Sequence, residues 1–286
     1  MAQNKPTTNE HYIPQFYLKQ FSPNPIDKNK KTIYQFDVLS GKQTPVLIKS
    51  ICYEKNLYEF KNDSGDYVHR NLIEKVFSVI EGESSNIFRS IQSKTKSEGN
   101  FYTHSFLSKK EKAVLIFFLS TMILRNPDVL QTMKDFVAEY ASEKASETSI
   151  RNFTLQTCLP IYKTLDPNER NILNGFIYLL SDMSFQIGVT NKEALWTSDR
   201  PVVLLSYNQP DCIDELIFPM SPSISLYMKP YEKSKKDRYN RLSILRKEDI
   251  QYANSAIVKH CKRWIYSKSP LTEKQIEWIK RERNEK

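Results

Sequence analysis

The chain has 286 residues, enough for one large domain or two ordinary ones. Hydrophobic residues make up 40% and charged residues 26%, as in globular proteins, and the six glycines are too few for long flexible linkers. The net charge of +9 favours anionic partners such as nucleic acid, although a basic run is commonly just a solvated face.

Cysteine spacing and hydropathy indicate a cytoplasmic protein. The four cysteines lie far apart and form no CxxC pair, which excludes a zinc knuckle and favours reduced thiols. The first residues contain no apolar segment of a signal peptide. The longest apolar stretch, residues 113–124, would rise only ~18 Å as a helix, short of the ~30 Å of a bilayer. We therefore expect no association with a membrane.

The first third of the chain is predicted to pass from a disordered lead to strands and then to a helix. Residues 1–10 are polar and form the expected lead, and residues 15–21 form a short helix. Residues 33–48 have the pattern of a β-hairpin with Gly41 in its turn, and residues 57–60 resemble a third strand. Apolar residues at steps of three and four then predict a long amphipathic helix over 69–92.

The middle of the chain is predicted to be helical. Ser108 and Glu111 form a capping box ahead of an apolar helix that ends before Pro127. A second helix should span 127–146, and Asp166-Pro167-Asn168-Glu169 has the residues of a further helix start.

The last third returns to strands and closes with two helices. Strand-like runs occur at 184–190, 194–197, 201–206, 215–218 and 223–228. Helices are expected at 247–261 and 271–283. We predict an α+β fold with a helical core, an N-terminal β-hairpin and a second antiparallel β region near residues 184–228. No linker is evident, so residues 11–286 are expected to form a single composite domain.

Motifs of several enzyme classes are absent. The chain has no GxSxG, HExxH, P-loop or dinucleotide-binding fingerprint. Zinc proteases, α/β-hydrolases, P-loop NTPases and Rossmann enzymes are therefore poor hypotheses.

Several segments together resemble a bacterial family of unknown function. Its members carry an N-terminal His-Tyr-x-Pro-Gln-Phe-Tyr-Leu signature, complete here as His11–Leu18, and a late Ser-Asp-x-Pro-Val motif, present here at 198–202. The remaining similar segments are Asn56-Leu57-Tyr58, the Glu-bearing helix at 71–81, Arg125-Asn126-Pro127 and residues 218–222. The resemblance spans roughly residues 9–267. It implies a bacterial or mobile-element origin and no particular reaction.

His11 and Gln15 are the first candidate catalytic residues. A free imidazole can give or take a proton near neutral pH, and the amide of Gln15 could orient it or bind a substrate oxygen. The structural alternative is a buried histidine that anchors the N-terminal segment.

The motif Ser198-Asp199-Arg200-Pro201 holds the next candidates. Asp199 could act as a base, ligate a metal or fix His11, and Arg200 could bind phosphate. The alternative is a turn whose Ser and Asp bond to the backbone. Arg125, at the end of the apolar helix, is a further candidate for phosphate binding, with a surface role at the helix terminus as the alternative. Glu74 and Glu81 share one helix face, where carboxylates can bind Mg²⁺ but are more often solvated.

The leading functional hypothesis is a nuclease or related phosphate-ester enzyme, acting on RNA or DNA in defence against mobile elements. In a metal-free version, His11 moves protons and Arg125 and Arg200 stabilise phosphoryl charge. In a metal version, Asp199 with Glu74 or Glu81 holds Mg²⁺ or Mn²⁺. The alternative is a non-catalytic module that binds nucleic acid, a nucleotide or a protein, and a weaker one is a toxin with a protein target.

Overall fold

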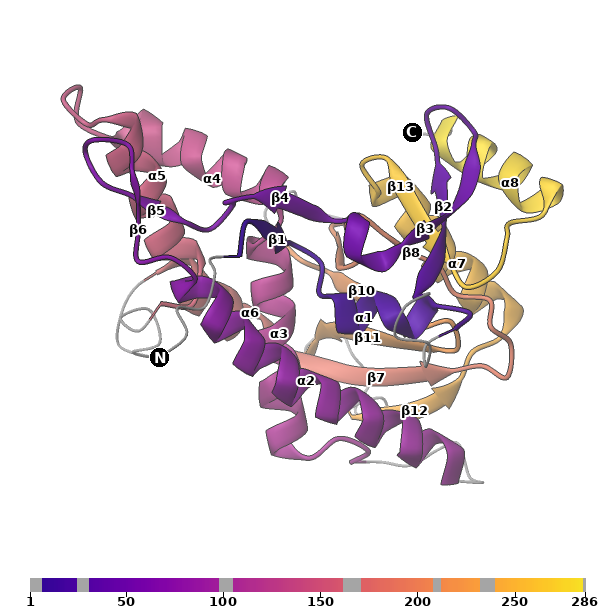
Figure 1. The fold of residues 1–286 in the computed structure, drawn as a ribbon. Coiled ribbons are helices and arrows are strands. Elements are labelled where there is room, and N and C mark those ends of the chain that lie inside the picture. Colours follow the sequence, from indigo (N-terminus) through magenta and orange to yellow (C-terminus); the bar gives the residue numbers. More distant parts are fainter. Residues whose placement is uncertain are drawn as a thin grey trace, which may run out of the picture. The chain divides into compact units, whose positions relative to one another are not determined.

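The fold mixes α-helices with mainly antiparallel strands, which confirms the α+β class (Figure 1). The computed structural model describes residues 7–24, 31–97, 105–161, 171–207, 212–231 and 240–284. Contacts between residues group the chain into two compact units, each assembled from separated segments. The first comprises Met1–Ile13, Cys52–Asn86 and Ala113–Ser181; the second comprises Pro14–Ile51, Ile87–Lys112 and Asp182–Lys286. The single domain expected over residues 11–286 stays a prediction.

The first unit contains two short antiparallel strand pairs. Strand β1 (Asn9–His11) pairs with β4 (Tyr53–Lys55), and β5 (Phe60–Lys61) pairs with β6 (Tyr67–Val68). Asn9 and Glu10, which we expected in a disordered lead, therefore lie in a strand, because their backbone bonds to β4. Residues 1–6 of that lead lie outside the described residues.

The predicted strand at 57–60 forms only at its last residue. Asn56 has a positive φ of 51° and turns the chain out of β4. The backbone N–H of Tyr58 then donates to the side chain of Glu10 instead of to a neighbouring strand. This segment between β4 and β5 becomes part of the candidate site described below.

Five helices contribute to the first unit. They are α2 (Leu72–Ser97), α3 (Lys109–Leu124), α4 (Pro127–Tyr140), α5 (Glu147–Cys158) and α6 (Ile172–Ser181), of which α2 and α3 also give residues to the second unit. The capping box ahead of α3 is confirmed: Ser108 N–H donates to Glu111 at 2.8 Å, and Glu111 N–H donates to the Ser108 hydroxyl at 3.2 Å.

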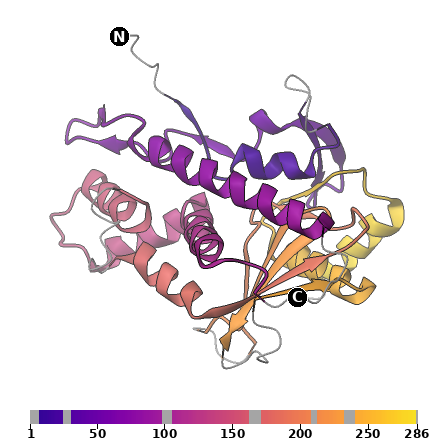
Figure 2. The same cartoon turned by 90° about the horizontal axis from the view of Figure 1, so that it is seen from below.

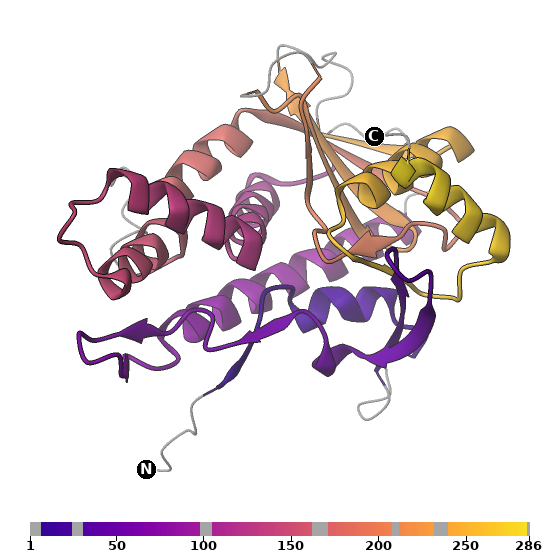
Figure 3. The same ribbon diagram turned by 90° about the horizontal axis from the view of Figure 1, so that it is seen from above.

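The helix predicted at 127–146 is shorter than expected. It ends at Tyr140, and Ser146 caps the separate helix α5 by accepting a hydrogen bond from Ser149 N–H. Figure 3 shows α4 and α5 side by side. The helix start expected at Asp166 falls outside the described residues.

The second unit is built on a five-stranded sheet with the order β12-β7-β11-β10-β9. Its strands are β7 (Met183–Val189), β9 (Val203–Leu205), β10 (Glu215–Ser221), β11 (Ile224–Pro230) and β12 (Arg241–Ile244). All neighbours are antiparallel except β12 and β7, which run parallel. The predicted antiparallel region near 184–228 is confirmed, and Figure 2 shows its orange strands from a second side.

A second sheet of this unit has the order β3-β2-β13-β8. The strands are β2 (Thr32–Asp37), β3 (Gln43–Leu47), β8 (Thr197–Ser198) and β13 (Trp264–Ser267). The predicted hairpin is confirmed as β2 and β3, with Gly41 at a φ of +69° in the turn. This left-handed conformation explains the glycine at that position.

Short and long helices complete the second unit. Helix α1 (Gln15–Leu18) continues into the 3-10 helix η1 (Lys19–Phe21), and η2 (Ile48–Ser50) follows β3. Helix α7 (Lys247–His260) contacts α8 (Glu273–Asn284). The buried face of α7 packs Ala253 and Ile257 against Ile217 and Leu195, and this cluster forms one core of the unit. Among the described residues, we find no single helix with both the length and the apolar character needed to cross a membrane.

Candidate active site

Four carboxyl groups and two guanidinium groups gather in the first unit, and the guanidinium of Arg70 adjoins them at 3.7 Å from Glu59. Their side chains come from β1, from the segment between β4 and β5, from α2, from the end of α3 and from α5. We call this group the carboxyl–guanidinium cluster; its members are Glu10, Tyr58, Glu59, Glu74, Glu81, Arg125 and Arg151.

Arg125 is buried within the cluster, with only 1% of its surface exposed. Its Nε donates to the carbonyl of Tyr12 at 2.8 Å, and its Nη1 donates to Glu81 at 3.0 Å. The guanidinium lies 4.8 Å from the centre of the Phe77 ring, a cation–π distance. Its Nη2 is buried and has no hydrogen-bond partner among the residues that the structure describes. Arg125 is thus held by three contacts and keeps one buried donor.

Tyr58 holds the backbone of Arg125 in place. Its hydroxyl donates to the backbone carbonyl of Arg125 at 3.0 Å, and its ring meets Phe77 edge-on at 5.1 Å. Burial raises the pKa of Tyr58 well above its ordinary value, so the phenol stays protonated and remains a donor. The end of α3 is therefore fixed at both its backbone and its side chain.

Glu10 and Glu59 form a buried carboxyl pair, each 1% exposed. One oxygen of Glu10 accepts the Tyr58 N–H at 2.7 Å, and Glu59 Oε1 accepts the Asn71 N–H at 2.9 Å. Burial, opposed by the Tyr58 bond and reinforced by the charge of Glu59, raises the pKa of Glu10 to about 8. Burial beside the charge of Glu59 thus favours the protonated form of Glu10.

Glu74, like Glu81, is a partly exposed carboxyl group of the cluster that lies near the buried charges. It is half-buried on α2, and burial raises its pKa to about 7 although the positive charge of Arg125 opposes the shift. The negative charges of Glu81 and Glu59 add to the rise. Within the described part of the chain, no group donates a hydrogen bond to Glu74. Glu74 can thus gain or lose a proton close to neutral pH.

Arg151 fixes the segment that carries Tyr58 and Glu59. One of its nitrogens donates to the carbonyls of Asn56, Leu57 and Glu59, at 3.0, 3.0 and 3.1 Å. These carbonyls do not take part in strand pairing. The arginine therefore supplies hydrogen bonds to backbone acceptors that would otherwise have no donor. The cluster is consequently held in place from α5 as well as from α3.

The signature octet is divided between the two units. His11 lies in β1 of the first unit, where its ring lies 5.5 Å from that of Tyr53, its partner across the strand pair. Gln15 begins α1 in the second unit. In the same helix, the buried Tyr17 donates its hydroxyl to the carbonyl of Pro219 at 2.7 Å and stacks on Phe218 at 5.0 Å. The aromatic half of the octet is therefore a packing anchor.

Asp199 lies in the second unit, where the backbone of residues 262–264 holds its carboxylate. Its two carboxylate oxygens accept hydrogen bonds from the N–H groups of Lys262, Arg263 and Trp264, at 2.9, 2.8 and 3.1 Å. These bonds hold the start of β13. Burial nevertheless raises the pKa of Asp199, against the effect of the three donors. Beside it, the backbone of Arg200 bonds to the Ser198 hydroxyl in both directions, which is the turn geometry expected as the alternative.

Metal-binding geometry is not found at the expected carboxylates. Asp199 lies in the second unit, and Glu74 and Glu81 lie in the first. In the described ranges, no three His, Cys, Asp or Glu side chains are arranged to hold a metal ion. We therefore derive no catalytic step through a metal.

Sequence reasoning missed Glu10, Glu59 and Arg151 as members of the cluster. Glu10 stands directly before the signature octet, and Glu59 stands between Tyr58 and Phe60. A charged residue between aromatic neighbours is an unusual pattern, because carboxylates are seldom fully buried without a partner. Arg151 gave no comparable signal, because helix α5 itself was not predicted.

The fold and the cluster define a class of protein. It is an α+β protein with buried acids and arginines that bond to one another and to the backbone. Beside them lies Glu74, whose pKa is raised to about 7. The chain belongs to the family described as "Protein of unknown function (DUF4238)", whose model matches residues 9–270. This confirms the resemblance to a family of unknown function. No curated protein and no solved structure matches the chain significantly.

Proposed function

We propose that the protein is a nuclease or a related phosphate-ester enzyme whose acid–base chemistry takes place at the carboxyl–guanidinium cluster. The observation that carries the proposal is the combination of Glu74, half-buried and titrating near neutrality, with the buried, partly unsatisfied guanidinium of Arg125. Groups with such shifted pKa values concentrate at catalytic sites. A role in defence against mobile elements is part of this proposal.

Glu74 is the proposed general base. In its ionised form it takes the proton of an attacking hydroxyl, the hydroxyl oxygen bonds to phosphorus, and the phosphorus–oxygen bond to the leaving alcohol breaks. The leaving oxygen then takes a proton, for which His11 of the same unit is the candidate donor. Arg125 Nη2 is the donor left to a phosphoryl oxygen, once the side chains that cover it move aside. Gln15, Asp199 and Arg200 belong to the second unit and take no part in this proposal.

The test is hydrolysis of RNA and DNA by the purified full chain and by two glutamate variants. Glu74→Gln should lower the rate at pH 7 by about 100-fold, since a positioned base contributes about 10²–10⁴-fold. Glu83→Gln alters an exposed residue of the same helix and should leave the rate unchanged. Absence of hydrolysis by the wild-type protein, with and without Mg²⁺ or Mn²⁺, would contradict the proposal.

A non-catalytic binding module is the second candidate. It is favoured by the bonds that two predicted site residues make within the protein. Asp199 accepts hydrogen bonds from three backbone N–H groups, and the backbone of Arg200 forms a turn with the Ser198 hydroxyl. On this reading the motifs are structural anchors. His11→Ala would then lower the melting temperature, whereas a catalytic His11 would lose activity with its melting temperature almost unchanged.

A further inference from the structure

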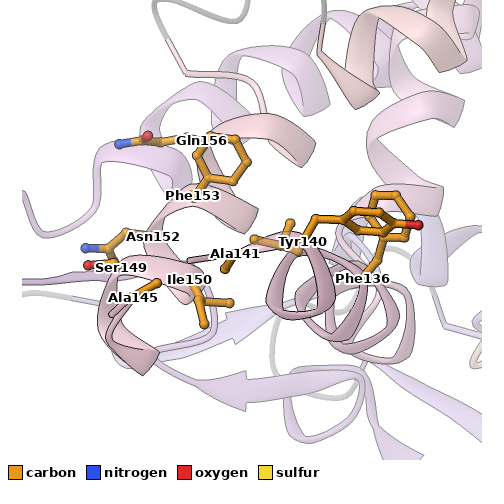
Figure 4. Close-up of a pocket in the computed structure, with 10 residues that line it drawn as sticks. Phe136, Tyr140, Ala141, Ala145, Ser149, Ile150, Asn152, Phe153 and Gln156 are labelled. Atoms are coloured by element: carbon orange, nitrogen blue, oxygen red, sulfur yellow. The ribbon is translucent and has the colours of Figure 1, made fainter. Parts of the chain in front are cut away.

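Helices α4 and α5 form a pocket of ≈ 690 Å³ in the first unit. Figure 4 shows Phe136 and Tyr140 on one helix and Ile150 and Phe153 on the other, on the two sides of the hollow. The volume is in the range of pockets that bind a ligand or anchor a partner's side chains. None of the lining residues belongs to the carboxyl–guanidinium cluster.

The aromatic side chains of this pocket are unusually exposed. Phe136 and Phe153 are each 54% exposed, and Tyr140 is 73% exposed. The rings of Phe136 and Tyr140 lie 4.9 Å apart and so form one continuous apolar surface. Meanwhile Leu130 and Leu155 are buried, so each helix already has a separate core-facing side. A concave aromatic surface opposite the core is typical of an interaction site.

Two exposed carboxylates adjoin the pocket lining along the chain. Glu139 precedes the lining residue Tyr140, and Glu143 lies between the lining residues Ala141 and Ala145. The last turn of α4 has no basic residue, so the negative end of the helix dipole adds to these carboxylates. Lys134 forms an ion pair with Glu147 at 2.8 Å. In the connection 141–146, Lys144 is an exposed cation.

We propose that this pocket binds an amphipathic helix of a partner protein. The helix would lie in the groove between α4 and α5 and insert apolar side chains between Tyr140 and Phe153. Its lysine or arginine residues would face Glu139 and Glu143. This is the helix-in-groove mode of recognition, in which apolar anchors supply affinity and flanking charges select the partner.

The test uses two synthetic helical peptides of about five turns, with leucines spaced along one face. One peptide carries lysines beside the leucines and the other carries glutamates. Fluorescence anisotropy with the full chain should show the lysine peptide binding at least about tenfold more tightly. Phe153→Ser should weaken that binding about tenfold. Tyr178→Ser, which removes an aromatic residue 63% exposed on α6, should not change it.

A charge reversal separates the proposal from its rivals. The double variant Glu139→Lys with Glu143→Lys keeps the apolar lining and should reverse the preference between the peptides, with circular dichroism confirming that it folds. Equal binding of both peptides by the wild-type chain would overturn the proposal. Self-association abolished by Phe153→Ser would instead identify a second copy as the occupant. Binding of an apolar dye to the pocket without binding of either peptide would identify a small apolar ligand.

Discussion

At the scale of single residues, the same physical rule explains both kinds of buried charge in this chain. Asp199 and Arg125 are almost fully buried, and hydrogen bonds hold both: Asp199 accepts three from backbone N–H groups, and Arg125 donates from Nε and Nη1. A buried charge without partners costs several kcal/mol, so such residues are held firmly in place. Glu74 differs because none of the described residues donates a hydrogen bond to it, and this difference makes it the candidate for proton transfer.

Arg125 is predicted to be essential for the stability of the first unit. Arg125→Leu leaves the carbonyl of Tyr12 without its donor and Glu81 without its counter-ion, and should lower the free energy of unfolding by about 3 kcal/mol. Glu81→Gln should cost about 1 kcal/mol or less, because its side chain is 29% exposed. Urea denaturation of both variants, with Glu83→Gln as control, measures the difference. Equal losses for Arg125→Leu and Glu83→Gln would contradict the bracing role.

At the scale of elements, short sequence motifs correctly predicted the features that form through interactions between nearby residues. The capping box at Ser108, the apolar pattern of α3 and the turn at Gly41 each act within a few residues, and all three are found. The helix start at Ser146 was missed because serines and threonines also occur in ordinary loops. The segment after Asn56 departs from its predicted strand because the side chain of Glu10 competes for its backbone.

Two glycines should respond in opposite ways to the same substitution. A Cβ at Gly188 in β7 would lie 2.9 Å from Leu245 Cγ and 3.0 Å from Tyr227 Cε2. We expect Gly188→Ala to lower the free energy of unfolding by about 1–3 kcal/mol through overpacking. Gly82 in α2 has open space around it, so Gly82→Ala should stabilise by about 0.5–1 kcal/mol. Thermal denaturation of the wild-type protein and of both variants measures these changes in stability.

The position of the clash gives this prediction its control. Adding Leu245→Ala to Gly188→Ala removes the side chain that the new methyl group meets. The double variant should lose less stability than the sum of the two single variants. Strict additivity would show that close packing is not the reason for the glycine.

At the scale of the whole molecule, the sequence predicted the fold class better than it predicted the candidate site. Alternating apolar patterns predicted an α+β fold with antiparallel strands, because burial of one face depends on the order of neighbouring residues. The carboxyl–guanidinium cluster depends instead on residues far apart in the chain, such as Glu10, Glu59 and Arg125, which no periodicity connects. Of the predicted site residues, His11 and Arg125 lie in the first unit, and Gln15, Asp199 and Arg200 lie in the second.

The central claim is that Glu74 acts as a base in a site whose arginine and neighbouring acids are fixed. The most direct measurement is the pH dependence of kcat/KM for phosphodiester hydrolysis, in the wild-type protein and in Glu74→Gln. Because the pKa of Glu74 is raised to about 7, the wild-type value should rise with pH and level off above about 7, as the carboxyl loses its proton. Glu74→Gln should be slower and lack this inflection. An unchanged profile in Glu74→Gln would contradict the account.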